Sequence, residues 1–304
     1  MSRDQGGVLP KRSNMERNEE VARLRRVVVA SGKGGTGKTL LATSLAIHWA
    51  RQGISVTYAD ADVEEPNGHL FLKPDITSTR PFTVDVPHLV GKCEACGRCQ
   101  EVCAFNAILA LRGRVMVFSE LCHGCGACVM ACLPQVLQMV PRETGKVREG
   151  LASGIRFCDG VLNVGEARAT PLIEGVLAAS GDGLVVVDAP PGTSCPAVAA
   201  VRDSDVAVLV TEPTPFGMHD LALAVGMCKA LTVPAAIVVN RSDLGGEVGA
   251  QVLGCPVIGR IPFDPQIAAA TARGERAIDA VPRFADTVAR LAAAVEAFAR
   301  EARP

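Results

Sequence analysis

The sequence predicts an α/β fold with a doubly wound, mostly parallel sheet, and three observations support this prediction. Short, fully apolar runs such as 206–210 recur along the chain. Runs with helical spacing separate them, and a glycine-rich loop joins the first apolar run, 27–30, to the first helical run. Strands that alternate with helices form parallel sheets whose two faces are both covered. The expected strands are 27–30, 54–58, 154–158, 183–188, 206–211 and 235–240, and the expected helices are 40–49, a run that ends near 179, and about 283–300.

The composition leaves room for one large domain and a small module, since the chain has 304 residues of which 48% are hydrophobic. A formal net charge of −1 gives no overall field that would attract nucleic acid or an anionic membrane, so we expect neither as a partner. No apolar run approaches the ~20 residues of a membrane helix, and we interpret residues 1–24 as a disordered lead-in without a secretory signal. We therefore expect a cytoplasmic protein without stable membrane insertion. Its twelve cysteines indicate metal binding rather than disulfides.

The glycine-rich loop, 31–39, has the order strand, loop, helix that a phosphate-binding loop requires. Glycines let backbone N–H groups turn toward phosphate oxygens, and the helix N-terminus adds a partial positive charge. Lys38 would reach the β- and γ-phosphates, and the Thr39 hydroxyl would lie on Mg²⁺. The alternative is a turn that binds nothing. The expected nucleotide contacts are Gly34, Gly35, Thr36, Gly37, Lys38, Thr39 and Leu40.

A second lysine, Lys33, follows the first glycine of this loop, and the segment 33–39 resembles the deviant Walker A motif of the MinD, ParA, Mrp and nitrogenase-iron-protein superfamily. The resemblance implies a P-loop NTPase fold, Mg²⁺-dependent ATP hydrolysis and a homodimer that forms on ATP binding. In that family the early lysine reaches the nucleotide of the partner subunit, and the resemblance assigns this catalytic role to Lys33. The alternative is an exposed loop lysine.

Acidic residues follow two of the expected strands, where a parallel sheet places its ligands. Asp60 and Asp62 follow 54–58 and resemble the switch I segment of the same superfamily, which implies that Asp62 positions the attacking water and that Asp60 belongs to the Mg²⁺ shell. The alternative is a solvated loop with capping acids. Asp188 ends a fully apolar strand, as a Walker B aspartate does, and would hold Mg²⁺ through water. Gly192 lies in a segment that resembles switch II, where a residue without a side chain can approach the γ-phosphate.

The nucleotide base should lie near the end of the strand 235–240. Asn240 can pair with the edge of adenine, and Pro262 would close the pocket through backbone contacts. The segment 240–243 also resembles the guanine motif Asn-Lys-x-Asp, in which Asp243 would accept from guanine. The superfamily resemblance favours ATP, and GTP stays open.

Eight of the cysteines form two runs with the spacing C-x2-C-x2-C-x3-C, which is the pattern of bacterial ferredoxins with two clusters. In that pattern the fourth cysteine of each run ligates the other cluster. Zinc, which also takes four thiolates, is the alternative. Both runs lack the usual proline after the fourth cysteine, since Ala104 and Leu133 stand there. The expected [4Fe–4S] ligands are Cys93, Cys96, Cys99 and Cys132 for one cluster, and Cys103, Cys122, Cys125 and Cys128 for the other.

Four cysteines lie outside the two runs. Cys228 and Cys255 lie in apolar surroundings and should be core residues. In the nitrogenase iron protein a cysteine after switch II helps to bridge a cluster between subunits, so Cys195, with Cys158, could bind a further cluster; inert thiols are the alternative.

The apolar stripe of the last helix is expected to pack on the core, since the opposite face is not basic enough for a membrane helix. That stripe consists of Phe284, Val288, Leu291, Val295 and Phe298.

Together these motifs predict two domains. Residues 25–81 and 150–304 would form the P-loop ATPase domain, and residues 82–149 would form a small inserted α+β domain of the bacterial ferredoxin type. The leading hypothesis is an ATPase whose nucleotide state gates electron transfer from two [4Fe–4S] clusters to an unidentified partner metalloprotein. The alternative is an ATPase that assembles or carries Fe–S clusters or another metallocofactor. A third hypothesis is a positioning ATPase like MinD with a merely structural ferredoxin.

Overall fold

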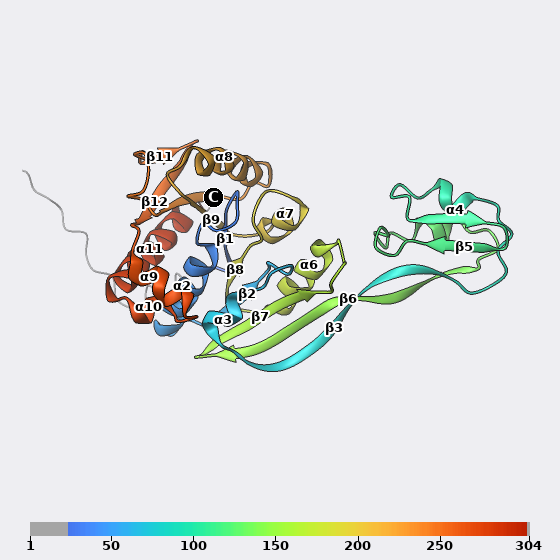
Figure 1. Ribbon diagram of the computed structural model, residues 1–304, viewed down its shortest axis with the longest axis horizontal. Coiled ribbons are helices and arrows are strands. Elements are labelled where there is room, and N and C mark those ends of the chain that lie inside the picture. The colour runs from blue at the N-terminus through green and yellow to red at the C-terminus, as the bar shows by residue number, and fades with distance from the viewer. Residues whose placement is uncertain (1–23, 303–304) are drawn as a thin grey trace, which may run out of the picture.

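The structure, a computed structural model, describes residues 24–302 (Figure 1). The predicted lead-in therefore lies, up to residue 23, outside the described residues. The strands are β1 (Arg26–Ala30), β2 (Val56–Asp60), β3 (Asp75–Leu89), β4 (Ile108–Leu111), β5 (Arg114–Val117), β6 (Leu137–Ala152), β7 (Ile155–Leu162), β8 (Leu184–Asp188), β9 (Val206–Thr211), β10 (Ala235–Asn240), β11 (Gln251–Val252) and β12 (Cys255–Ile261). The helices are α2 (Lys38–Arg51), α3 (Gly68–Leu72), α4 (Arg98–Glu101), α5 (Ala127–Met130), α6 (Ala169–Ala179), α7 (Cys195–Val201), α8 (Pro215–Ala230), α9 (Pro265–Ala272), α10 (Ala277–Ala280) and α11 (Pro282–Glu301).

A ten-stranded sheet in the described part of the chain has the order β11-β12-β10-β9-β1-β8-β2-β7-β6-β3. Its middle is parallel, because β1 pairs with β8 and β9, and β2 pairs with β7 and β8, all in the same direction. The edge strands β3 and β6 on one side and β11 on the other are antiparallel to their neighbours. The predicted doubly wound, mostly parallel sheet is confirmed.

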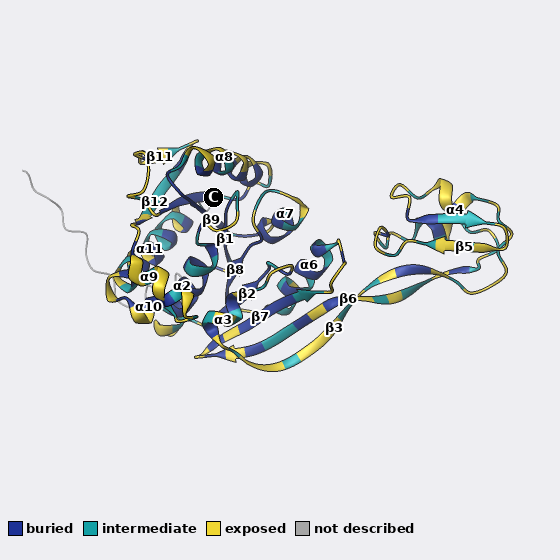
Figure 2. Cartoon of the chain, viewed as in Figure 1, coloured by how far each residue is buried: buried dark blue, intermediate teal, exposed yellow. Residues whose placement is uncertain are grey.

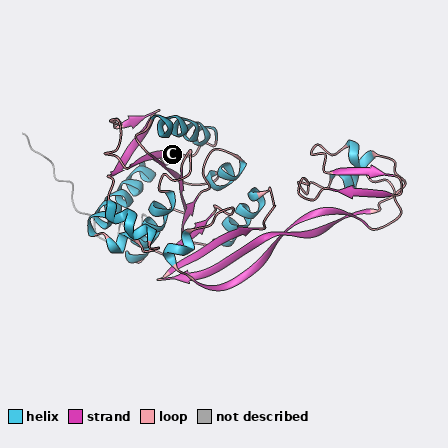
Figure 3. Ribbon diagram, viewed as in Figure 1, coloured by secondary structure: helices cyan, strands magenta, loops and turns pink. Residues whose placement is uncertain are grey.

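Helices cover both faces of this sheet (Figure 3). Successive side chains of a strand point to opposite faces, so the apolar run in β1 serves two cores. Val27 and Val29 pack toward α2, α10 and α11, whereas Val28 and Ala30 pack toward α6, α7 and α8. A strand buried on both faces needs an unbroken apolar sequence, which explains why these runs lack the alternation of a half-exposed strand.

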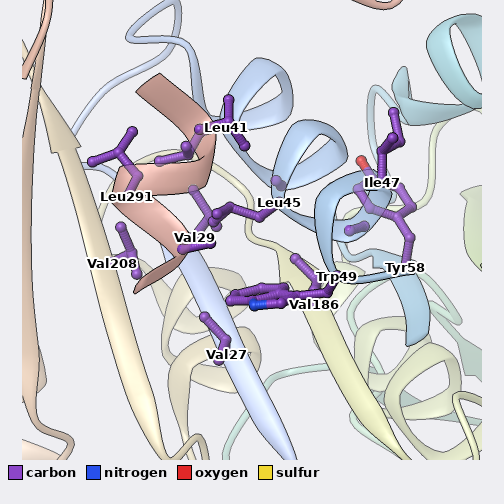
Figure 4. Close-up of a cluster of buried hydrophobic side chains, with 14 of the residues drawn as sticks. Val27, Val29, Leu41, Leu45, Ile47, Trp49, Tyr58, Val186, Val208 and Leu291 are labelled. Atoms are coloured by element: carbon purple, nitrogen blue, oxygen red, sulfur yellow. The ribbon is translucent and has the colours of Figure 1, made fainter. Parts of the chain in front are cut away.

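The last helix packs on the core, as its apolar stripe predicts. Phe284, Val288, Leu291 and Val295 are buried in the same cluster as α2. Figure 4 shows Leu291 near Leu41 of α2. Trp49 lies in this cluster and donates its indole N–H to Glu296 of α11 at 2.8 Å. No helix in the described part of the chain is both long enough and apolar enough to span a bilayer.

The cysteine-rich segment stands apart from the sheet on a two-stranded ribbon (Figure 1). β3 and β6 pair along their whole length, from Asp75 with Leu151 to Leu89 with Leu137. β6 also pairs with β7, but only from Gly145 to Ala152. The outer part of the ribbon therefore consists of β3 and β6 alone and extends away from the rest of the sheet and its helices, called here the body. Residues 90–136, called here the cysteine lobe, contain β4, β5, α4 and α5. The outer edge of the ribbon, β3, is mostly exposed (Figure 2).

The predicted domain limits fall inside this ribbon. The sequence changes in texture at Pro81, which lies within β3, and residue 150 lies within β6. Proline removes a backbone donor, yet an edge strand tolerates it because one side of the strand has no neighbour to bond. The large sheet therefore continues past Pro81, with a shift in the β3–β6 register between Phe82 and Thr83.

The packing of α11 gives a direct test. Leu291→Ala should lower the free energy of unfolding by about 2–5 kcal/mol, because it leaves a cavity where a 2% exposed side chain fills the space between α11 and the sheet. Leu223→Ala on α8, where the side chain is 52% exposed, should cost about 0.5 kcal/mol or less. Urea denaturation measures both values. Equal losses in the two variants would contradict the packing described here.

Candidate functional site

A cavity of about 580 Å³ lies at the carboxyl ends of the central strands. It is bounded by the phosphate loop, by the segment after β2, and by the segments that follow β10 and β12. This is the edge at which open parallel sheets bind their ligands. The predicted residues that line it are Gly34, Gly35, Gly37, Lys38, Thr39, Leu40, Asp62, Asn240 and Pro262. Phe71, Phe263, Ile267, Ala268 and Thr271 add the apolar part of the wall.

The phosphate loop has the open backbone that a phosphate cradle needs. Gly35 and Gly37 have φ values of 75° and 97°, which side chains rarely adopt. A Cβ atom on Gly37 would also lie 2.5 Å from the amide nitrogen of Asn240, so this position requires glycine twice over. Gly34 and Gly35 have no atom within 4 Å of such a position, which leaves space for a ligand.

Lys38 begins α2 and is only 7% exposed. Burial lowers the pKa of its ammonium group, while the charges of Asp188, Asp62 and Asp60 oppose that change. The lysine thus lies among three carboxyl groups at the floor of the cavity. A phosphate group that enters here meets a cation whose hydration has already been removed, so little desolvation cost is left for binding.

Asp60 and Asp188 lie opposite each other in the register of β2 and β8, and both are at most 1% exposed. Burial raises the pKa of each carboxyl group, and the charge of Asp188 raises that of Asp60 further. Asp60 accepts backbone N–H groups from Asp62 at 3.2 Å, Asn67 at 3.1 Å and Gly68 at 2.8 Å. It therefore shapes the loop that carries Asp62, and its predicted place in the Mg²⁺ shell stays a prediction.

Asp188 has the features of a metal-facing carboxylate. Its Oδ2 accepts from the hydroxyl of Tyr58 at 2.9 Å, whereas its buried Oδ1 has no hydrogen-bond partner among the described residues. A buried carboxylate oxygen beside the Thr39 hydroxyl and the Lys38 ammonium is an acceptor to which a Mg²⁺-bound water could donate. The residues present therefore fit a Mg²⁺ ion held by Thr39 and, through water, by Asp188.

Asp62 and Gly192 lie in the segments that follow β2 and β8, and of the two only Asp62 lines the cavity. Burial raises the pKa of Asp62 to about 6, with Asp188 adding to the shift and Lys38 opposing it. Asp62 lines the cavity, as expected for a group that orients a water molecule. Gly192 has a φ of 90° and donates its N–H to the carbonyl of Ser31 at 3.0 Å. The segment after β8 is thus bonded to the start of the phosphate loop.

Asn240 lies at the cavity, but its side chain is occupied. Its amide nitrogen donates to the carbonyl of Thr36 at 2.7 Å, and its oxygen accepts from the N–H of Arg241 at 2.9 Å. It therefore supports the phosphate loop in this structure, and its contact with adenine stays a prediction. Asp243 accepts from the N–H of Phe263 at 2.6 Å and does not line the cavity. This geometry gives no support to the guanine interpretation.

Lys33 lies at the rim, where its ammonium nitrogen is 3.1 Å from Glu212 Oε2. The other carboxylate oxygen of Glu212 is 2.5 Å from Arg241. The Glu212 side chain is only 11% exposed, so one carboxylate at the end of β9 fixes both cations. In the single chain Lys33 thus has a partner of its own, and its action across a dimer stays a prediction.

The cysteine lobe brings its eight cysteines together in two groups of four. One cavity is lined by Cys93, Cys96, Cys99 and Cys132, and a second by Cys103, Cys122, Cys125 and Cys128. Each group takes one cysteine from the other run, as the ferredoxin spacing predicts.

Backbone N–H groups in the lobe point at the thiol sulfur atoms. Ala95 N–H donates to Cys93 Sγ at 3.3 Å, and Gly124 N–H donates to Cys122 Sγ at 3.4 Å. Such bonds stabilise thiolate ligands of an iron–sulfur cluster. Burial raises the pKa of Cys99 and Cys128, so a bound metal would be needed to keep these thiols ionised. The donor set therefore fits two iron–sulfur clusters.

The positions of the four remaining cysteines do not fit a cluster bridged by both Cys158 and Cys195. Cys158 lies inside β7, is 2% exposed and has its pKa raised to about 12 by burial. Cys195 is exposed at the start of α7. A thiol in the core cannot ligate a cluster shared between subunits, so Cys158 is not the second bridging ligand. Cys228 and Cys255 are buried, as expected of core residues.

Three residues with contacts at these sites, Tyr58, Glu212 and Arg168, are not predicted from the sequence. Tyr58 has a fully buried hydroxyl on Asp188, and Glu212 orients Lys33. Arg168 joins the body to the cysteine lobe by donating to the carbonyl of Cys122. Tyr58 is the sole tyrosine of the chain and stands two residues before Asp60, which is a signal that could have been used. Glu212 and Arg168 have no such signal, because their partners are distant in sequence.

Comparison with known proteins places the fold and the family. The fold resembles the cell division ATPase MinD of Pyrococcus furiosus, with a TM-score of 0.56 and 19% identity, over 90% of this chain and 98% of that chain. An uncharacterized protein of Methanocaldococcus jannaschii is 29% identical over 257 residues, which are 82% of this chain and 90% of that protein. The iron-sulfur cluster carrier protein of Deinococcus radiodurans is 27% identical over 283 residues, covering 84% of this chain and 64% of that protein.

The carrier protein of Pyrococcus horikoshii is 24% identical over 259 residues, covering 79% of this chain and 74% of that protein. Residues 27–278 match the CobQ/CobB/MinD/ParA nucleotide binding domain. This match spans both halves of the sheet, from β1 to α10. This match agrees with the phosphate loop and the cavity that it lines, and the chain belongs to the CobQ/CobB/MinD/ParA family of nucleotide-binding P-loop proteins.

Proposed function

We propose that this protein is an ATP-hydrolysing iron–sulfur protein that carries [4Fe–4S] clusters and hands them to acceptor proteins. The observation that supports this most is the presence of two cavities with four cysteines each on a P-loop nucleotide-binding fold. Proteins named as iron-sulfur cluster carriers are among its relatives. That similarity favours the carrier hypothesis over gated electron transfer, which the motifs alone ranked first.

The nucleotide half of the proposal follows from the floor of the large cavity. The backbone of 34–37 and the ammonium of Lys38 hold the phosphates, and Thr39 with Asp188 holds Mg²⁺. Asp62 orients a water molecule toward the γ-phosphorus. The water oxygen bonds to phosphorus as the bond to the β–γ bridging oxygen breaks, which yields ADP, inorganic phosphate and a proton. Lys33 is proposed to complete the site of a partner subunit when it leaves Glu212.

The cysteine half of the proposal concerns the cargo. Cys96 and Cys125 are exposed while Cys99 and Cys128 are buried, so each group of four has one side toward solvent. Acceptor thiolates can reach that side and replace those of the lobe one at a time, with no net oxidation or reduction. Among the described residues, no three or more His, Cys, Asp or Glu side chains converge on a position for one metal ion. The C-x2-C-x2-C-x3-C spacing of the two cysteine runs is what favours iron–sulfur clusters over zinc.

Gated electron delivery is the second candidate, and the position of the lobe favours it. The chain enters the ribbon after α3, which follows Asp62. It returns from the ribbon through β7 and α6 to β8, which ends in Asp188. The lobe is thus inserted between the two segments that would sense the γ-phosphate. Redox potentials that differ between the ATP and ADP states would support electron delivery, and equal potentials would leave the carrier function alone.

The nucleotide site predicts that two substitutions separate binding from hydrolysis. Lys38→Met should weaken ATP binding about 100-fold, since a hydrogen bond to a charged group contributes about 3 kcal/mol. Asp62→Asn should still bind ATP and should hydrolyse it about 100-fold more slowly or worse, since it loses the group that orients water. Calorimetry and phosphate release measure the two effects.

Two matched variants on the exposed part of the ribbon, Lys146→Met and Asp75→Asn, serve as controls and should behave as the wild type. If Asp62→Asn lost binding and hydrolysis to the same extent, the water-orienting role would be wrong.

The cysteine lobe predicts a defined cargo. Protein purified without oxygen should contain about eight iron and eight sulfide per chain, as two cubane clusters. It should also activate an acceptor protein that lacks its [4Fe–4S] cluster, faster with ATP than with ADP. Iron analysis and acceptor activity provide the measurement.

The double variant Cys96→Ser with Cys125→Ser should lose both cargo and transfer, while Cys195→Ser should retain both. Zinc in place of iron, or transfer that ignores nucleotide, would count against the carrier function.

A further inference from the structure

The cysteine lobe contacts the ATPase body through a polar cluster in addition to the ribbon. This cluster consists of Arg142 on β6, Glu166 in the loop between β7 and α6, and Arg168 at the N-cap of α6. Here it is called the arginine clasp. Figure 1 shows α6 on the side of the sheet that faces the lobe, and the Arg168 side chain donates to the carbonyl of Cys122.

Glu166 is the anchor of the clasp. Its side chain is 1% exposed and forms ion pairs with both arginines, including 2.9 Å from its Oε1 to Arg168 Nε. It also accepts the backbone N–H of Arg168 at 3.2 Å. The loop itself is fixed, because the N–H of Asn163 donates to the carbonyl of Thr144 at 3.0 Å. A buried carboxylate held in this way fixes the direction of two guanidinium groups.

Both guanidinium groups then reach into the lobe. Arg168 donates to the carbonyl of Cys122, and Arg142 donates to the carbonyl of Ser119 at 3.4 Å. Cys122 lines the cavity that also contains Cys103, Cys125 and Cys128. The clasp therefore holds the lobe next to the cavity that Cys122 lines. The other cysteine cavity is lined by a different set of residues.

Arg168 has an unusual balance of burial and bonding. Its side chain is 10% exposed, and one of its terminal nitrogens is buried without a hydrogen-bond partner among the described residues. An unsatisfied donor of a charged group is costly to bury, so a plain structural ion pair would not retain it without compensation. A negative group bound in the adjacent cavity would supply such compensation through its charge.

We propose that Arg168 is a positioning residue that fixes the cysteine lobe on the ATPase body and places a positive charge beside the cavity of Cys103, Cys122, Cys125 and Cys128. The charge favours the reduced, more negative form of a cluster in that cavity and so raises its reduction potential. Neither Ser119 nor Cys122, the two residues that the clasp contacts in the lobe, lines the other cavity. The part of this inference that concerns potential rests on the proposed binding of clusters, and the part that concerns docking does not.

The test compares full-length, cluster-loaded wild type with Arg168→Met and Arg168→Lys. In Arg168→Met one of the two reduction potentials should fall. For a one-electron couple, a fall of about 59 mV corresponds to a tenfold change in the reduction equilibrium. Amide hydrogen exchange of residues 119–122 should rise about tenfold, because the segment loses its contact with the body. Arg168→Lys keeps the charge without the planar fork, so its potential should stay near the wild-type value while its exchange rises part of the way.

The control is Arg202→Met, which removes an arginine with a 52% exposed side chain from the end of α7. It should change neither potential and leave the exchange of 119–122 unaltered. Arg168→Met with wild-type potentials and wild-type exchange would overturn the proposal, and so would equal shifts of both potentials. If Arg168→Met loses its iron, Arg168→Lys decides: raised exchange supports the proposal, and wild-type exchange overturns it.

Failure of the proposed function looks different from failure of this inference. A wild type without iron, or without ATP-dependent transfer, would contradict the carrier function, yet hydrogen exchange would still report on the docking of the lobe. A wild type that carries both clusters and shows no response to Arg168→Met would retain the carrier function and remove the role given to Arg168.

Discussion

Two carboxyl groups that face each other at the ends of β2 and β8, Asp60 and Asp188, constrain the rest of the nucleotide site. Both are buried, so their repulsion is not screened by water and must be balanced locally. Backbone N–H groups of the following loop bond to Asp60, and Tyr58 bonds to Asp188. Lys38 is drawn into the same space. The site is thus prepared for Mg²⁺ and phosphate, whose charges complete the balance.

The same strands determine where the cysteine lobe lies. β7 pairs beside β2, and β6 continues the hydrogen bonding from β7 into the ribbon. A hydrogen-bonded ribbon limits bending far more than a flexible linker does. With the arginine clasp at Cys122, the lobe has a second attachment near α6. α6 packs on α7, and α7 follows the segment whose Gly192 bonds to the phosphate loop. Contacts therefore connect the two functional regions without a break.

The cysteine pattern predicts iron–sulfur chemistry but leaves its use open. The spacing groups the eight cysteines, because in the two-cluster ferredoxin pattern three close cysteines of one run share a site with the fourth cysteine of the other run. Whether clusters are cargo or electron carriers depends on the partner protein, which no spacing describes. Similarity to iron-sulfur cluster carriers therefore reverses the order of the two hypotheses. The nucleotide motif is more informative, because the phosphate loop indicates the ligand and also lines the cavity in which the ligand would lie.

The sequence by itself determined the central strands, the phosphate loop, the last helix and the grouping of the cysteines. These features are local or periodic: an apolar run, a glycine-rich turn and a C-x2-C spacing each report their own structure. Only the tertiary structure decided that Pro81 lies within an edge strand, that Asn240 bonds to Thr36, that Cys158 is in the core, and that Lys33 pairs with Glu212. Arg168 and Cys122 are likewise brought together by the ribbon. Each of these outcomes depends on residues far apart in the chain, and such contacts follow from how the strands are ordered rather than from any short stretch of sequence.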